Sequence, residues 1–98
     1  MSSSVFWLSR QLKKCIFRPL NENCIEIDID NVKKIVYCPT TEEYEITSAV
    51  VVKAKEQNAS IITYPTSWCK ATSNAISSGR QLDIEVIPFG EFLKKYES

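Results

Sequence analysis

Apolar and polar residues alternate from Cys24 to Asp30, in the order CIEIDID. Successive side chains of a strand point to opposite faces, so one face is all isoleucine and the other is all acidic: Ile25, Ile27 and Ile29 against Glu26, Asp28 and Asp30. The pattern predicts a strand with its isoleucines in the core. The three carboxylates either bind a divalent cation or form the solvated side of a sheet, and the pattern leaves both open.

Hydrophobic spacing and turn residues predict the element order α-β-β-β-α-β-α-β-α. The predicted helices lie near 5–16, 41–57, 68–78 and 91–96, and the predicted strands near 15–20, 24–30, 32–38, 59–64 and 84–87. Strands that alternate with helices are typical of a partly parallel sheet covered on both faces. The opening hairpin makes the sheet mixed. We therefore expect an α/β fold, a single small domain over 1–98 with a mixed β-sheet flanked by helices.

Capping signals set the predicted helix ends. Thr40 or Thr41, followed by acidic residues, is expected to begin the second helix, because acids are favourable at a helix N-terminus. Thr66 or Ser67 is expected to begin the third helix, and Gly79 to end it.

The chain has twelve basic and twelve acidic residues, so no overall charge attracts it to nucleic acid or to anionic lipid. The charge is uneven, however, because the first twenty residues hold four bases and no acid. These bases and a nearby lysine are the predicted residues for binding nucleic acid or a partner: Arg10, Lys13, Lys14, Arg18 and Lys33. A solvated face is the alternative interpretation.

An acid-free, serine-rich start also suits a mitochondrial presequence. Otherwise we expect an intracellular protein, cytoplasmic or nuclear, without membrane contact, because no apolar run is long enough for a membrane span. The cysteines at 15, 24, 38 and 69 form no CxxC pair, and the chain has no histidine. This argues against a structural zinc and against thiol catalysis, so buried, reduced thiols are expected.

The order of elements, with an E-I-D strand followed by an apolar strand, resembles the restriction-endonuclease-like superfamily of PD-(D/E)xK nucleases, and its Mrr-type branch most closely. Further matches are Asn58–Thr63, Ile84–Ile87 and Glu91–Leu93, so the resemblance covers about residues 10–96. In that family the aspartate of the E-I-D strand, here Asp28, binds a metal ion. The next strand ends in Glu-x-Lys, whose glutamate also binds metal and whose lysine polarises the attacking water.

This chain departs from the family at that second motif, because the segment Ile35–Thr40 holds no carboxylate and no lysine. The resemblance therefore implies a degenerate nuclease fold that serves as a non-catalytic binding or assembly module in nucleic-acid metabolism, with a protein partner and no cofactor. The alternative is a Mg²⁺-dependent nuclease whose site is incomplete or is completed by a partner. Its residues would be Glu26, Asp28, Asp30 and Lys34, with Asp28 and Asp30 as metal ligands.

A second resemblance is to the end of a BRCT domain, carried by Trp68-Cys69 and by Ser78–Asp83. It implies a protein-interaction domain with Trp68 in its core, and a chain this short is expected to bury such a side chain in any case. The chain lacks the Gly-Gly turn of that family. Its loose counterparts for phosphopeptide binding are Ser9 and Lys53 or Lys55.

Overall fold

A computed structural model describes residues 8, 10–12, 16–21, 23–29, 31–39, 43–66 and 68–96. Its main sheet has the strand order β1-β2-β3-β5-β7, and a second sheet pairs β4 with β6. The strands are β1 (Ile16–Pro19), β2 (Cys24–Ile29), β3 (Val32–Tyr37), β4 (Glu45–Ile46), β5 (Ile61–Tyr64), β6 (Lys70–Ala71) and β7 (Glu85–Pro88). The helices with described bounds are α2 (Ser48–Glu56), α3 (Ser73–Gln81) and α4 (Phe89–Tyr96).

The main sheet is mixed. Strands β1, β2 and β3 pair in antiparallel fashion, and β3, β5 and β7 pair in parallel. The antiparallel part comes from the predicted hairpins, and the parallel part comes from the alternation of strands and helices that follows. The predicted α/β fold with a mixed, helix-flanked sheet is thus confirmed.

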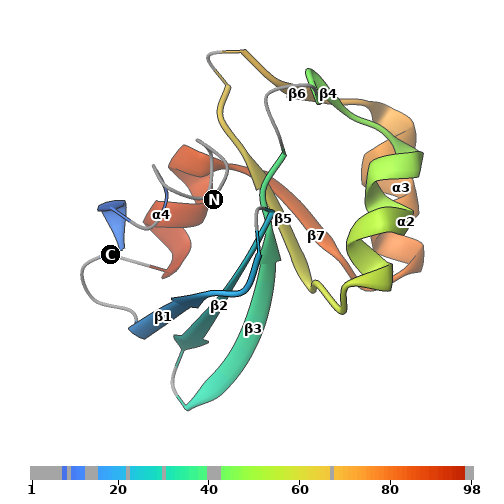
Figure 1. The fold of residues 1–98 in the computed structure, drawn as a ribbon. Helices are drawn as coiled ribbons and strands as arrows, with labels where there is room; N and C mark the ends of the chain where they lie inside the picture. Colours follow the sequence, from blue (N-terminus) through green and yellow to red (C-terminus); the bar gives the residue numbers. More distant parts are fainter. Residues whose placement is uncertain are drawn as a thin grey trace.

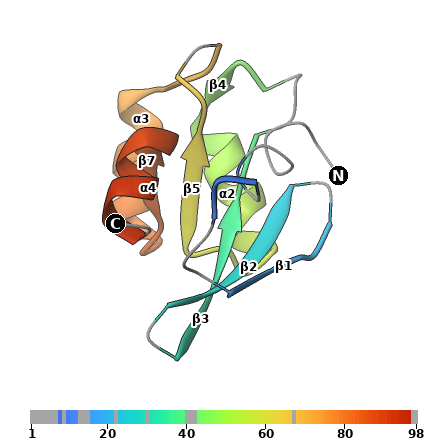
Figure 2. The ribbon, with the colours of Figure 1, turned by 90° about the vertical axis from the view of Figure 1, so that its left-hand side faces the viewer.

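Helices cover both faces of the sheet, with α2 and α3 side by side on one face and α4 on the other (Figures 1 and 2). The hydrophobic core is correspondingly split into two clusters. The cluster under α2 and α3 includes Cys24, Tyr37, Val51, Ala54, Ile62 and Ala75. The cluster under α4 includes Leu8, Leu12, Ile25, Ile27, Val36, Phe89 and Phe92. The predicted burial of Ile25 and Ile27 is confirmed, and each is 0% exposed.

The predicted starts of the second and third helices were wrong. Helix α2 begins after Thr47, whose hydroxyl accepts a hydrogen bond from the Val50 N–H at 3.4 Å. Helix α3 begins after Thr72, whose hydroxyl accepts from the Ala75 N–H at 3.1 Å. Each is an ordinary N-cap, a few residues later than expected. Gly79 was predicted to end a helix, but it lies inside α3 and packs against Ile84.

Two other expectations need correction. Trp68 is not in the core, since it is 37% exposed and precedes β6 rather than lying in a helix. Strands β4 and β6 were not predicted at all.

The helix predicted over 5–16 falls largely outside the described residues. Of it, Leu8 and Leu12 are buried, and the Leu12 N–H donates to the Leu8 carbonyl at 3.2 Å, which is one helical turn.

Candidate functional site

The acidic face of β2 carries charges that are balanced by its neighbours. The register places Arg18 opposite Glu26 and Lys33 opposite Asp28, and directly opposed residues share a sheet face. An Arg18 guanidinium nitrogen lies 3.5 Å from a Glu26 carboxylate oxygen. Because Arg18 is 71% exposed, this ion pair adds little stability. Glu26 and Asp28, with Arg18 and Lys33, therefore form one mixed, partly exposed surface.

The residues of the nuclease alternative do not converge. Lys34 is paired with Ile27, which belongs to the core under α4, so Lys34 and Asp28 lie on opposite faces of the sheet. The Lys34 ammonium instead lies 6.0 Å from the centre of the Tyr96 ring. Asp30 falls outside the described residues. Within the described part of the chain, no group of three or more histidine, cysteine, aspartate or glutamate side chains is arranged to hold a metal ion.

Of the remaining predicted binding residues, some lie outside the part of the chain that the structure describes. Arg10 is exposed, whereas Lys13, Lys14 and Ser9 lie outside the described residues. The lysines that the BRCT resemblance suggests have other contacts. Lys53 pairs with Glu43 at 3.5 Å, and Lys55 donates to the Leu82 carbonyl at 3.4 Å.

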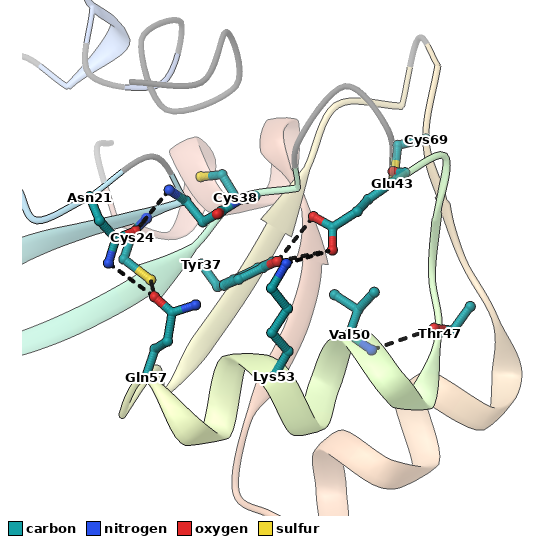
Figure 3. Close-up of polar contacts among 11 residues, drawn as sticks. Asn21, Cys24, Tyr37, Cys38, Glu43, Thr47, Val50, Lys53, Gln57 and Cys69 are labelled. Carbon is teal, nitrogen blue, oxygen red and sulfur yellow. Dashed lines mark hydrogen bonds and ion pairs between the residues drawn. The ribbon is translucent and has the colours of Figure 1, made fainter.

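A polar network joins the end of β3 to α2 (Figure 3). The Tyr37 hydroxyl lies 3.0 Å from both carboxylate oxygens of Glu43, and the Lys53 ammonium completes the group from α2. Burial, followed by the charge of Glu43, raises the pKa of Tyr37, so the hydroxyl stays protonated and donates. The network fixes the segment before β4 against the sheet. We regard it as structural, because Tyr37 is 0% exposed and cannot meet a substrate.

The described cysteines are also structural. Cys24, Cys38 and Cys69 are unpaired and buried, as predicted for reduced thiols, while Cys15 lies outside the described residues. Burial raises the pKa of each described thiol, for Cys69 to about 11. A thiolate, not a thiol, is the nucleophile, so none of the three is activated for catalysis.

A polar concavity lies where β5 and β7 begin, and we call it the basic groove. Its volume is about 420 Å³, and it is lined by Lys34, Ser60, Ile61, Gly79, Arg80, Asp83, Ile84, Glu85, Lys95 and Tyr96. Three of these residues are cations from three different elements: Lys34 from β3, Arg80 from α3 and Lys95 from α4. Such a convergence of cations suits an anionic ligand.

Two acids, Asp83 and Glu85, line the basic groove beside its three cations, so the groove keeps one net positive charge. Glu85 is held by Lys95 and by the Tyr96 hydroxyl, which donates at 2.7 Å. Burial alone would raise the pKa of Glu85, but these hydrogen bonds and the charges of Lys95 and Lys34 lower it overall. Glu85 is thus ionised and already paired. Among the ion pairs found in the described residues, none includes Lys34 or Arg80.

Ser60 adds an unsatisfied hydroxyl to the same groove. Both of its backbone polar groups are hydrogen-bonded, because its N–H donates to the Ile35 carbonyl at 2.9 Å and its carbonyl accepts from the Glu85 N–H at 3.0 Å. Its Oγ is buried and has no hydrogen-bond partner within the described structure. A buried polar atom without a partner is costly, so this hydroxyl lowers the stability of the fold.

No pattern in the sequence predicted this groove. Lys34, Arg80 and Lys95 are far apart along the chain, and no motif links them. Only the topology, which places the starts of β5 and β7 beside β3 and α4, brings them together.

The chain matches no protein-family model, and comparisons with curated proteins and with solved structures found no significant match. In the described part of the chain, no helix combines the length and the apolar character needed to span a membrane.

Proposed function

We propose that this protein is a non-catalytic binding and assembly module in nucleic-acid metabolism, and that its basic groove holds the phosphate backbone. The observation that carries the proposal is the convergence of Lys34, Arg80 and Lys95 on one groove. Cationic side chains that meet from separate elements form a fixed surface for phosphate groups.

The attraction must be local, because the chain as a whole is neutral. Arg80 provides a planar guanidinium that can bind two phosphate oxygens at once, and Lys34 provides a point charge beside it. Lys95 contributes less attraction for phosphate, because it is already paired with Glu85. Contacts of this kind recognise the backbone rather than the base sequence.

Two further observations support the proposal. The resemblance of the sequence to PD-(D/E)xK nucleases suggests nucleic acid as the ligand class. The separation of Asp28 and Lys34 on opposite sheet faces supports binding without hydrolysis, because a nuclease needs its metal ligands and its cation at one point.

The proposal is tested by fluorescence anisotropy with a short labelled oligonucleotide, both single-stranded and duplex. We expect the double variant Lys34→Glu with Arg80→Glu to bind about ten-fold or more weakly, because two attractive charges become repulsive. Lys33→Glu is the matched control. It repeats the Lys34→Glu charge reversal, which is one of the two in the double variant, at the neighbouring position on the opposite sheet face. It is therefore compared with Lys34→Glu alone and should leave the affinity nearly unchanged.

The salt dependence provides a second readout. With up to three phosphates neutralised, log K should fall with log salt at a slope of about −2 to −3 on duplex DNA, and the double variant should lose most of that slope. The proposal fails if the chain binds neither oligonucleotide at low salt. It also fails if Lys33→Glu weakens binding as much as the double variant does.

A further inference from the structure

Glu85 places a carboxylate inside the basic groove, among the cations that line it. Two residues of α4 hold this carboxylate: the Lys95 ammonium forms an ion pair with it, and the Tyr96 hydroxyl donates to it at 2.7 Å. The Lys34 ammonium on β3 also acts on it, because its positive charge helps to lower the pKa of Glu85. Three groups that line the groove therefore already interact with an anion of the protein itself.

A phosphate group at this end of the groove would need the same partners. Hydrogen bonds from an ammonium or a hydroxyl to an anionic oxygen are strong whether that oxygen belongs to a carboxylate or to a phosphate. In the free protein, Glu85 already balances the charge of Lys95. A phosphate that approaches Lys95 must therefore displace the carboxylate or lie beside it against charge repulsion.

We propose that Glu85 is a built-in competitor of the phosphate backbone, which occupies Lys95 and Tyr96 and limits the affinity of the basic groove. Because it concerns regulation of the phosphate site, this proposal rests on the proposed function. Lys34 and Arg80 carry the binding in the unaltered chain, and Lys95 joins them only when the carboxylate is neutralised or displaced. Fewer phosphate contacts make binding easier to reverse, which suits a module that must release its ligand.

Asp83 is the second acid of the basic groove and provides the matched control. It lines the same groove, but no ion pair found in the described residues includes it. Asp83→Asn removes one negative charge, as Glu85→Gln does, and asparagine tolerates the positive φ of 57° at this position. Asp83→Asn therefore reduces the repulsion of phosphate without releasing a cation, whereas Glu85→Gln does both.

The test is fluorescence anisotropy with single-stranded and duplex oligonucleotides over a range of salt concentrations. The slope of log K against log salt changes by about 0.9 for each phosphate neutralised on duplex DNA and by about 0.7 on a single strand. We expect Glu85→Gln to steepen the slope by one such step, because Lys95 becomes available, and Asp83→Asn to leave it unchanged. Glu85→Gln should also bind about five-fold or more tightly at low salt, since no exposed ion pair has to break. Glutamine keeps an oxygen that can accept from the Tyr96 hydroxyl, so the fold should be retained.

The double variant Glu85→Gln with Lys95→Gln removes the ion pair as a whole. We expect it to bind like the unaltered chain and with the same slope, because Lys34 and Arg80 carry the binding in both. The proposal is overturned if Glu85→Gln and Asp83→Asn have equal slopes. It is also overturned if the double variant binds more weakly with a shallower slope, because Lys95 would then contact phosphate beside Glu85. If neither the unaltered chain nor Glu85→Gln binds either oligonucleotide, the proposed function fails as well. Circular dichroism of each variant confirms that it is folded.

Discussion

Gly79 provides the sharpest test of the packing between α3 and β7. It is buried in the last part of α3, and a Cβ atom placed on it would lie 2.6 Å from the carbonyl oxygen of Ile84 and 3.1 Å from a methyl carbon of Val86. The Ile84 N–H also donates to the Gly79 carbonyl at 2.7 Å. The close approach of the two backbones therefore requires glycine at this position.

Two opposing effects decide the result of Gly79→Ala. Replacing glycine by alanine inside a helix normally stabilises it by about 0.5–1 kcal/mol. Here the added methyl group meets a backbone oxygen that cannot move without shifting β7, and overpacking of this kind costs about 1–3 kcal/mol. We expect a net loss of about 1–2 kcal/mol, equivalent to about 4–8 °C of melting temperature for each kcal/mol in a chain of this size.

Urea denaturation of Gly79→Ala beside Gly90→Ala checks this reasoning. Gly90 lies in α4, and a Cβ atom there would meet nothing within 4 Å, so Gly90→Ala should be neutral or stabilising. The m-values should agree, which shows that the denatured states are comparable. If Gly79→Ala proved as stable as Gly90→Ala, the close contact between α3 and β7 would be refuted.

Three further predictions concern the core, the pH dependence and the metal. Phe92→Ala should cost about 3–5 kcal/mol in chemical denaturation, because Phe92 is 0% exposed under the sheet; a loss below about 1 kcal/mol would contradict its place in the core. Burial raises the pKa of Cys69 from 9.0 to about 11, so its contribution to the free energy of unfolding is fully present below pH 9 and should fall as the pH rises toward 11. In urea titrations, Cys69→Ala should make that decline less steep. Asp28→Ala should change stability by no more than about 0.5 kcal/mol, and neither it nor the unaltered chain should melt higher or cleave DNA with Mg²⁺; a Mg²⁺ effect abolished by Asp28→Ala would revive the nuclease alternative.

Local patterns were sufficient to predict the strands of the main sheet. The alternation along β2 placed Ile25 and Ile27 in the core, and Asn31 and Asn58, which lie between predicted elements, adopt positive φ angles. Such signals are local, since a strand face or a turn depends on neighbouring residues. The order of elements along the chain was predicted, but the order of the strands across the sheet was not.

The errors arose where a tertiary contact overrode a local signal. The acids after Thr41 resembled a helix start, but Glu43 is held by Tyr37 and Lys53 instead, and the helix begins only after Thr47. Trp68 was expected in the core because it is large, but other residues form both core clusters.

The basic groove could not be predicted from the sequence. It combines residues that are distant in the chain and that share no motif, such as Lys34 and Lys95. Their proximity results from the order of the strands in the sheet, which hydrophobic patterns do not specify.

The central claim, that the basic groove binds a phosphate backbone, is tested most directly by NMR titration of the ¹⁵N-labelled chain with a short oligonucleotide. Our account predicts that the amide signals of Lys34, Ser60, Arg80 and Lys95 shift together and saturably, and that added salt reverses the shifts. Shifts confined to the opposite sheet face around Asp28, or no shifts at low salt, would contradict it.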